Sequence, residues 1–230
     1  MNLLDPFLAQ VRQRPDAPAI IAARRAITFA QLDLASRKAA RLLHAAGLRV
    51  GDGVLLLQPM SIALYTALLA HCRLGLVTVL FDPAAGRAHI ERCCAMYPLH
   101  AFVGSPRAHL LRLLSPAIRR LPRQIAIGGA VPGALPWRHL DRCAPLDDIT
   151  PCAPATPAIL TFTSGSTGRP KAALRSHGFL LAQHRALESS LSLRPGEVDL
   201  TTLPVFLLAN LASGVTSVIP DADLRAPGRL

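Results

Sequence analysis

The sequence predicts an α/β fold in which a mostly parallel sheet is flanked by helices. Several short apolar runs carry no charged side chain, as expected for strands that are buried on both faces. Between these runs lie segments whose apolar residues recur at helical spacing. Strands and helices that alternate in this way form a parallel sheet with helices on both faces. We expect one such domain over residues 1–220, followed by a polar tail at 221–230.

The first third of the chain shows this alternation most clearly. In chain order its pattern predicts a helix at 3–14, strands at 19–22 and 26–29, a helix at 29–46, a strand at 54–57, a helix at 61–74 and a strand at 76–81. Pro15 ends the first helix, and Gly47 and Gly75 each follow a helix at the position where glycine commonly stops one. Because 51% of the 230 residues are apolar, the chain can bury a substantial core.

The same unit repeats in the rest of the chain. We expect helices at 88–96, 107–114, 176–191 and 206–213, and strands at 101–103, 124–127, 158–163, 172–175, 199–203 and 215–219. Residues 128–157 are rich in proline, glycine and aspartate, which predicts a long surface connection. Two uncharged windows, 53–72 and 200–220, are long enough for a membrane span. Internal residues such as Pro59 and Pro204 divide them, so we expect buried α/β elements and no transmembrane segment.

The formal net charge of +11 raises the question of a nucleic-acid partner. The basic residues are nearly all arginines, scattered in ones and twos, and aromatic residues make up only 4% of the chain. Nucleic-acid binding uses clustered basic residues and aromatic side chains that stack on bases. We therefore interpret the excess charge mainly as a solvated surface and expect no nucleic-acid partner. A non-catalytic basic protein that binds nucleic acid or an anionic membrane remains the alternative.

Cysteine and histidine usage favours a reduced, cytoplasmic setting. The five cysteines are odd in number and include no C-x-x-C pair, so the sequence indicates neither a disulfide framework nor a zinc site. The first residues lack the basic start, apolar core and cleavage site of a secretory signal. The eight histidines show no metal-ligand spacing. His177, at the start of a predicted helix, is interpreted as a helix cap or a surface residue, with a pocket residue as the alternative.

The most informative segment is T-F-T-S-G-S-T-G-R-P-K at residues 161–171, directly after an apolar run. Gly165 and Gly168 allow a backbone to fold closely around an anion, and Lys171 brings a positive charge. Hydroxyl and backbone N–H groups in the segment can donate hydrogen bonds to the oxygens of the anion. A loop of this composition suits a polyphosphate, although such loops are also common on surfaces that bind nothing.

The spacing of this segment excludes two other phosphate loops. A Walker loop places its lysine directly after the second glycine, at the start of a helix. Here Arg169 and Pro170 separate Gly168 from Lys171, and strand-like residues follow. Pro170 also lacks an N–H group to offer an anion. The glycine pattern G-x-G-x-x-G of dinucleotide-binding folds does not occur in this segment either.

The nine residues from Thr163 to Lys171, T-S-G-S-T-G-x-P-K, resemble the phosphate-binding signature of the adenylate-forming superfamily. That superfamily contains acyl-CoA synthetases, the adenylation domains of peptide synthetases, and luciferases. Residues 18–29 resemble its opening hairpin, and residues 47–57 resemble its G-x-x-x-G-D-x-V-x-L segment. The resemblance implies that the chain is a partial N-terminal domain of such an enzyme.

The resemblance also implies a reaction and the roles of individual residues. In the family a carboxylate attacks the α-phosphorus of ATP and gives an acyl-adenylate and pyrophosphate, with Mg²⁺ assisting. The residues implied to bind ATP are Thr163, Ser164, Gly165, Ser166, Thr167, Gly168 and Lys171. Lys171 is the candidate catalytic residue, because it would neutralise the pyrophosphate. Ala172 stands where family members usually have glycine, which lowers the expected flexibility of the loop.

Residues 202–213, T-L-P-V-F-L-L-A-N-L-A-S, fall where acyl-activating members carry a P-x-F-H motif followed by a helix of small residues. The resemblance implies a carboxylic acid substrate and places Phe206, Leu207 and Asn210 in its pocket. Leu207 replaces the expected histidine and removes a polar group from the acyl side. The segment is most similar to the branch that acts on long β-hydroxy acids in olefin and β-lactone synthesis.

Several later motifs of the superfamily are absent from these 230 residues. They include the segment with a magnesium-binding acid and adenine contacts, the T-G-D segment that holds the ribose, and the domain with the lysine that assists adenylation. We therefore expect a fragment of a longer enzyme, a truncated or split gene, or a short binding protein. Unaided turnover should be negligible, and the missing part could be carried by a separate chain.

Overall fold

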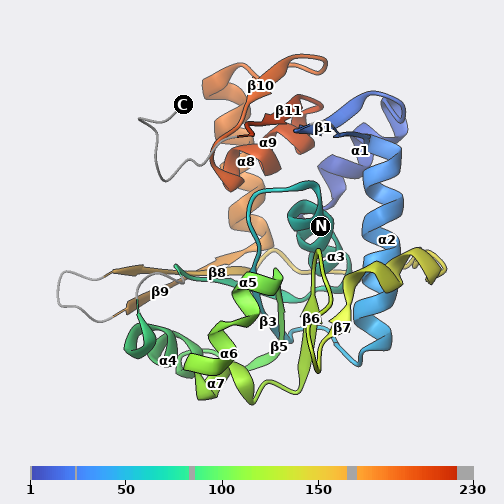
Figure 1. The fold of residues 1–230 in the computed structure, drawn as a ribbon. Coiled ribbons are helices and arrows are strands. Elements are labelled where there is room, and N and C mark those ends of the chain that lie inside the picture. Colours follow the sequence, from blue (N-terminus) through green and yellow to red (C-terminus); the bar gives the residue numbers. More distant parts are fainter. Residues whose placement is uncertain (1, 24, 83–85, 165–169, 222–230) are drawn as a thin grey trace.

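The structure is a computed structural model that describes residues 2–23, 25–82, 86–164 and 170–221 (Figure 1). For residues 163 and 164 it describes the backbone alone. The larger of its two sheets has the strand order β7-β6-β5-β3-β4-β8-β9, formed by β7 (Leu135–Pro136), β6 (Arg123–Ala126), β5 (Leu99–Gly104), β3 (Gly53–Leu57), β4 (Val77–Leu80), β8 (Pro157–Ser164) and β9 (Pro170–Ser176). Every neighbouring pair in it is parallel except β8 with β9. The predicted mostly parallel sheet is confirmed.

Helices cover both faces of the seven-stranded sheet. The helices of the described chain are α1 (Asp5–Gln13), α2 (Phe29–Ala45), α3 (Ile62–Leu74), α4 (Arg87–Ala95), α5 (Pro106–His109), α6 (Leu111–Leu114), α7 (Pro116–Arg119), α8 (His177–Leu191), α9 (Pro204–Ser213) and the 3-10 helix η2 (Trp137–Arg142). In β3, Val54 and Leu56 join the core formed with α2 and α3, whereas Leu55 joins the core formed with α4 and α7. Because successive strand residues point to opposite faces, an uninterrupted apolar strand is buried on both sides, as predicted.

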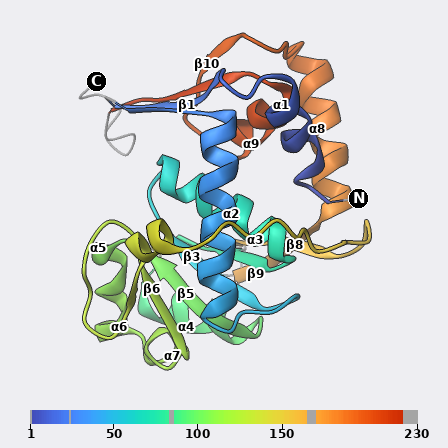
Figure 2. The same cartoon turned by 90° about the vertical axis from the view of Figure 1, so that its right-hand side faces the viewer.

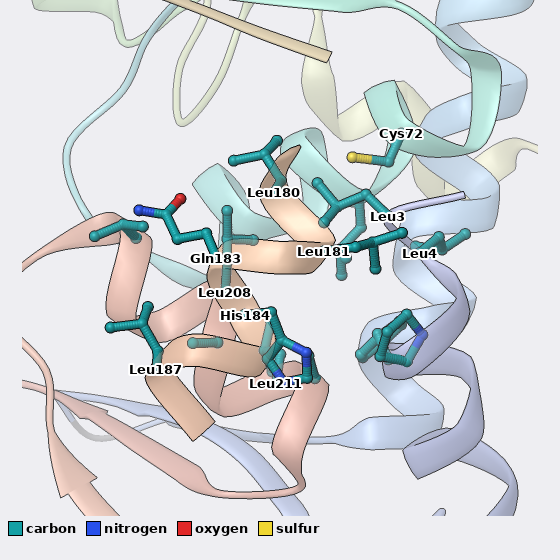
Figure 3. Close-up of a pocket in the computed structure, with 16 residues that line it drawn as sticks. Leu3, Leu4, Cys72, Leu180, Leu181, Gln183, His184, Leu187, Leu208 and Leu211 are labelled. Atoms are coloured by element: carbon teal, nitrogen blue, oxygen red, sulfur yellow. The ribbon is translucent and has the colours of Figure 1, made fainter. Parts of the chain in front are cut away.

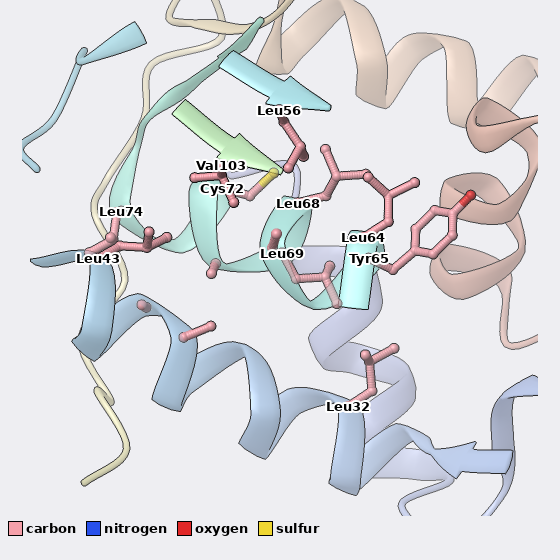
Figure 4. Packing of buried hydrophobic residues seen from close by; sticks show 14 of the residues in the cluster. Leu32, Leu43, Leu56, Leu64, Tyr65, Leu68, Leu69, Cys72, Leu74 and Val103 are labelled. Atoms are coloured by element: carbon pink, nitrogen blue, oxygen red, sulfur yellow. The ribbon is translucent and has the colours of Figure 1, made fainter. Parts of the chain in front are cut away.

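The helix α3 lies at the centre of the main core. Figure 4 shows Leu64 and Leu68 of α3 beside Leu56 and Val103 of the sheet, with Leu32 of α2 on the other side. Its bounds follow from the sequence, because the Ser61 side chain accepts a hydrogen bond from the Leu64 N–H at one end and Gly75 is left-handed, with φ 64°, at the other. This is the helix predicted at 61–74.

A buried ion pair joins α2 to α3. The Arg73 guanidinium donates to the Asp33 carboxylate at 2.5 Å, and the side chain of Arg73 is only 2% exposed. Arg37 lies one turn after Asp33 and also contacts Asp147. Burial raises the pKa of Asp33 although two arginines oppose the shift, and burial likewise lowers the pKa of Arg73. The pair is therefore costly to desolvate and depends on both partners being present.

The second sheet joins the two ends of the described chain. Its order is β10-β11-β1-β2, formed by β10 (Val198–Leu200), β11 (Thr216–Ile219), β1 (Pro18–Ala22) and β2 (Arg25–Thr28). The strand β1 runs parallel to β11 and antiparallel to β2. Figures 1 and 2 show this sheet at the end of the molecule opposite α5, α6 and α7. The sequence predicted these strands but not that they form a sheet of their own.

Two predicted segments differ from the structure. Residues 128–157, predicted as a surface connection, contain β7 and η2 and bury Trp137, Leu146 and Cys152. These apolar residues are isolated among turn-forming residues, so they show no periodicity. Trp137 and Leu146 join the main core with α2, and the Leu146 N–H donates to the Arg37 carbonyl oxygen. The predicted helix at 107–114 is instead divided into α5 and α6, and α7 follows from Pro116.

The two uncharged windows form separate strands and helices, as predicted from the residues that divide them. Residues 53–72 give β3 and most of α3, and residues 200–220 contain α9 and β11. Among the described residues no helix is both long enough and apolar enough to cross a membrane. No disulfide joins any of the five cysteines in the part of the chain that the structure describes.

Candidate functional site

The predicted phosphate loop connects the two antiparallel strands β8 and β9. Thr163 pairs with Lys171 and Ser164 with Pro170, so the hairpin closes directly on the segment 165–169. The strand β4 pairs with β8 only as far as Thr161, and the rest of the hairpin extends past it (Figure 1). The loop therefore follows the carboxyl end of β8, the end of parallel strands at which α/β folds commonly bind ligands.

Lys171 is exposed and is the second residue of β9. Gly165, Ser166, Thr167 and Gly168 lie outside the described residues, and the side chains of Thr163 and Ser164 also do. The structure thus places the two ends of the predicted loop and its lysine beside one another. The roles assigned to these residues remain predictions.

A cross-strand hydrogen bond holds the base of this hairpin. Arg175 Nη1 on β9 donates to Thr161 Oγ1 on β8 at 2.6 Å. The strand β9 is the edge of the sheet in the described part of the chain, so β8 is its one neighbour there. A charge-assisted bond across the hairpin therefore supports the register that brings Lys171 opposite Thr163.

The residues after β9 anchor the hairpin to the body of the molecule. Ser176 caps α8 by accepting a hydrogen bond from the Phe179 N–H. The Gly178 N–H donates to the Pro154 carbonyl oxygen at 2.8 Å, and a Cβ atom at Gly178 would lie 2.9 Å from that same oxygen. Glycine is thus required for this close approach. Sequence reasoning missed this role, because a lone glycine at a helix start carries no distinguishing signal.

His177 is fully buried, which corrects its interpretation as a surface residue. Its Nδ1 accepts a hydrogen bond from the Leu3 N–H at 3.0 Å. Burial lowers the pKa of His177, and the charge of Asp5 opposes the shift. A neutral His177 therefore ties the start of the chain to the helix that follows the hairpin. The sequence showed an isolated histidine, and its partner 174 residues away gave no local pattern.

The segment predicted to line an acyl pocket forms the helix α9. Phe206 and Asn210 lie on an open depression between α9 and β10, together with Thr201 and Val215. Leu207 is fully buried in the main core and does not line this depression. The structure thus brings two of the three predicted pocket residues together and directs the third elsewhere.

Asn210 is the centre of a polar network at the floor of this depression. Its amide Nδ2 lies 2.8 Å from Asp199 Oδ2, 3.1 Å from Thr201 Oγ1 and 3.0 Å from Ser217 Oγ. Thr201 also donates to Asp199 Oδ2 at 2.8 Å. The Asn210 donor is therefore already shared among protein acceptors, and the network fixes α9 against β10 and β11.

A small apolar cavity of about 40 Å³ lies elsewhere, between the N-terminal segment, α3, α8 and α9. Figure 3 shows Leu3, Leu181 and Leu208 around it, with His184 at one side. The His184 Nε2 lies 2.9 Å from Ser213 Oγ, so this ring is engaged with α9. A space of this size holds at most a few water-sized groups. It is a packing space and has no contact with the hairpin of Lys171.

The described residues contain no group of three or more histidine, cysteine, aspartate or glutamate side chains that could hold a metal ion. Mg²⁺ usually keeps several waters and is held by one or two carboxylates together with substrate phosphates. A dedicated cluster is therefore not required for Mg²⁺ to arrive with a nucleotide.

Comparison with known proteins places these features in context. The family described as AMP-binding enzymes matches residues 7–229. The chain is 34% identical over 239 residues to an olefin beta-lactone synthetase of Stenotrophomonas maltophilia, an alignment that covers 95% of this chain and 42% of the relative. It is 27% identical to the 3-hydroxybenzoate–CoA/4-hydroxybenzoate–CoA ligase of Thauera aromatica, covering 97% of this chain and 46% of that one.

Solved structures show the same fold. An anthranilate CoA ligase in complex with anthranoyl-AMP matches with a TM-score of 0.87 at 20% identity, over 100% of this chain and 46% of the solved chain. An acetoacetyl-CoA synthetase from Streptomyces lividans matches with a TM-score of 0.83 at 25% identity, over 95% of this chain and 38% of the solved chain. The chain thus spans less than half the length of each of these proteins.

Proposed function

The chain belongs to the AMP-binding enzyme family of adenylate-forming enzymes, and from this premise we propose that it is the phosphate-binding part of an ATP-dependent acid-activating ligase. The observation that carries the proposal is the hairpin of β8 and β9, which pairs Thr163 with Lys171 at the two ends of the signature segment, in a chain that the family matches over residues 7–229. The proposed reaction joins a carboxylate to the α-phosphorus of ATP and releases pyrophosphate.

Within this reaction the chain acts by positioning and by charge. The hydroxyl and backbone N–H groups of residues 163–168 bind the β and γ phosphates, and the Lys171 ammonium offsets the negative charge of the leaving pyrophosphate. Mg²⁺ would arrive with the nucleotide and would supply further neutralisation of the phosphate charge. The exposed position of Lys171 at the end of the hairpin leaves its ammonium accessible to such a ligand.

For the substrate we propose a hydrophobic carboxylic acid, with a long β-hydroxy acid as the specific candidate. Two relatives of at least 30% identity are named olefin beta-lactone synthetases, whereas others are named for aromatic acids. The half-exposed ring of Phe206 offers an apolar contact on the depression beside β10. Leu207 is buried in the main core and adds no contact to this depression.

We also propose that residues 1–230 bind ATP but do not turn it over alone. The acid that binds magnesium, the ribose-binding aspartate and the lysine that assists adenylation are expected in the part of the relatives that this chain does not span. Loss of a group that stabilises developing charge typically costs about 3–4 kcal/mol, and several are lost together. Activity would then need the rest of the enzyme, on the same or a second chain.

Lysine substitution tests the proposal, because the chain has only two lysines, Lys38 and Lys171. We expect MgATP to bind the 230-residue chain, and Lys171→Ala to weaken this binding about tenfold, as loss of a charge-assisted contact does. Lys38→Ala on α2 is the matched control and should bind as the parent does. Equal affinity in both variants would contradict the assignment of Lys171.

Robust ATP–pyrophosphate exchange by the 230-residue chain with β-hydroxy acids would contradict the claim of inactivity.

A further inference from the structure

The short helices α5, α6 and α7 present apolar side chains to solvent. Leu110, Leu113 and Leu114 are 59%, 77% and 59% exposed, and Leu113 is the most exposed large apolar side chain in the described part of the chain. Three exposed leucines within five residues are unusual, because scattered single residues are the common pattern on soluble surfaces.

The exposure of these leucines is specified by the local fold. Other residues of the same segment already fill the core: His109 is buried, and its Nε2 lies 3.0 Å from the Ile125 carbonyl oxygen. Ser115 is buried as the cap of α7 and accepts from the Ile118 N–H, while Ile118 itself is fully buried. With the inward positions occupied, Leu110, Leu113 and Leu114 have no place in the core.

Arginines flank these leucines along the chain. Residues 92–140 contain seven arginines and no aspartate, glutamate or lysine. Arg107, Arg119 and Arg120 are exposed on α5 and α7 or directly after them. A carboxylate does touch the segment, but Glu91 of α4 accepts hydrogen bonds from Ser115 Oγ and the Ala117 N–H at the start of α7 and is partly buried there. The outward charge of these helices is positive.

We propose that this surface docks on an anionic lipid membrane. We call it the basic apolar face and define it by Arg107, Leu110, Leu113, Leu114, Arg119 and Arg120. Leucines of an interfacial segment insert at the boundary of headgroups and acyl chains, while arginines stay at the level of the phosphates. The positive charge of the arginines complements anionic headgroups. The leucines would contact the acyl chains, whereas a purely polar partner offers them no apolar contact.

Nucleic acid fits this face less well. Non-specific binding of nucleic acid uses basic residues with aromatic platforms, and α5, α6 and α7 contain no aromatic side chain other than the buried ring of His109. Three exposed leucines gain nothing from phosphates. Figures 1 and 2 place α5, α6 and α7 at the end of the molecule opposite α9 and the four-stranded sheet, so docking there would leave those elements free. This proposal does not rest on ATP binding.

Vesicle co-flotation tests the proposal with the 230-residue chain and no nucleotide. We expect binding to vesicles of phosphatidylcholine that contain phosphatidylglycerol, weaker binding at raised salt, and little binding to phosphatidylcholine alone. Arg119→Gln with Arg120→Gln should weaken binding about tenfold or more, since each basic residue near an anionic surface contributes roughly a factor of five. Leu110→Ser with Leu113→Ser should weaken it by a similar factor, because the apolar contribution is lost.

A matched double variant on α8, Leu191→Ser with Arg185→Gln, removes one exposed leucine and one exposed arginine at the opposite end of the molecule. It should bind vesicles as the parent does. Because all substituted side chains are exposed, circular dichroism and thermal midpoints should match the parent and exclude misfolding. Absence of binding to anionic vesicles overturns the proposal, as does equal loss in the α8 variant. Binding of RNA or DNA that needs Arg119 and Arg120 but not Leu110 and Leu113, without vesicle binding, overturns it in favour of a nucleic-acid surface.

Discussion

At the scale of residues, histidines buried in the neutral form make the fold sensitive to acid. Burial lowers the pKa of His71, His109, His177 and His184, and for His71 the value is about 3. His71 is fully buried, with its Nδ1 2.8 Å from Thr78 Oγ1. In the unfolded chain these rings take up protons near pH 6.5. The folded state therefore binds fewer protons than the unfolded state below that pH.

We expect the free energy of unfolding to fall as the pH is lowered from 7 to 5. The folded pKa of His71 is depressed, so its contribution is complete above about pH 6.5 and is lost as the pH falls toward 3; at pH 5 the loss for this one residue is about 2 kcal/mol. His71→Gln should flatten the pH dependence of urea unfolding. An unchanged slope in this variant would contradict the role of His71, and the exposed His44→Gln is the control.

The ion pair of Asp33 and Arg73 gives a second prediction at this scale. Asp33→Asn removes the charge that compensates the buried Arg73, and we expect it to lower the free energy of unfolding by about 3 kcal/mol or more. The double variant Asp33→Leu with Arg73→Met should be more stable than Asp33→Asn, because no unpaired charge is then buried. Urea unfolding measures both. If the double variant were the less stable of the two, the pair would matter for reasons other than charge compensation.

At the scale of elements, the hairpin of β8 and β9 illustrates what local pattern could predict. An apolar run predicted β8, and the unusual composition of 163–171 located the loop, because both are local properties. The start of α8 was predicted for the same reason, whereas the cap by Ser176 was not. The bond from Arg175 to Thr161 could not be predicted, since it depends on strand register. The same limit explains why the breaks between α5, α6 and α7 were missed.

We expect the bond from Arg175 to Thr161 to stabilise β9 against local opening. Thr161→Val keeps the shape of the side chain but removes the acceptor, and we expect about 1 kcal/mol less protection for the amides of β9, with little change in β3. Hydrogen exchange resolved by residue provides the measurement. Thr163→Val, two residues along the same strand, is the comparison. An equal loss of amide protection on β9 in both variants would show that the exchange of threonine for valine acts through strand propensity and not through the bond to Arg175.

At the scale of the whole molecule, contacts between segments far apart in the sequence hold the fold together. The strand β1 lies between β2 and β11, with Ile20 opposite Ser217. Asn2 is buried, and its amide Nδ2 donates to the carbonyl oxygens of Cys72 and Thr150. Elements at both ends were predicted from periodicity, but their partners were not, because parallel pairing over nearly 200 residues leaves no local trace. The alternation of two cores across β3 was predictable, since it follows from strand geometry.

The outer face of the four-stranded sheet gives the prediction for the whole molecule. Leu200 lies beside Val218, which lies beside Ile21, so one apolar row crosses three strands on the face that α9 does not cover. In the described chain β10 is an edge strand, with Val198 67% and Leu200 64% exposed. An exposed apolar edge promotes pairing between chains.

We expect concentration-dependent association in light scattering, which Val198→Lys with Leu200→Lys should suppress. Leu34→Lys on α2 is the control and should associate as the parent does; equal suppression by this variant would show that net charge, and not the sheet edge, governs association.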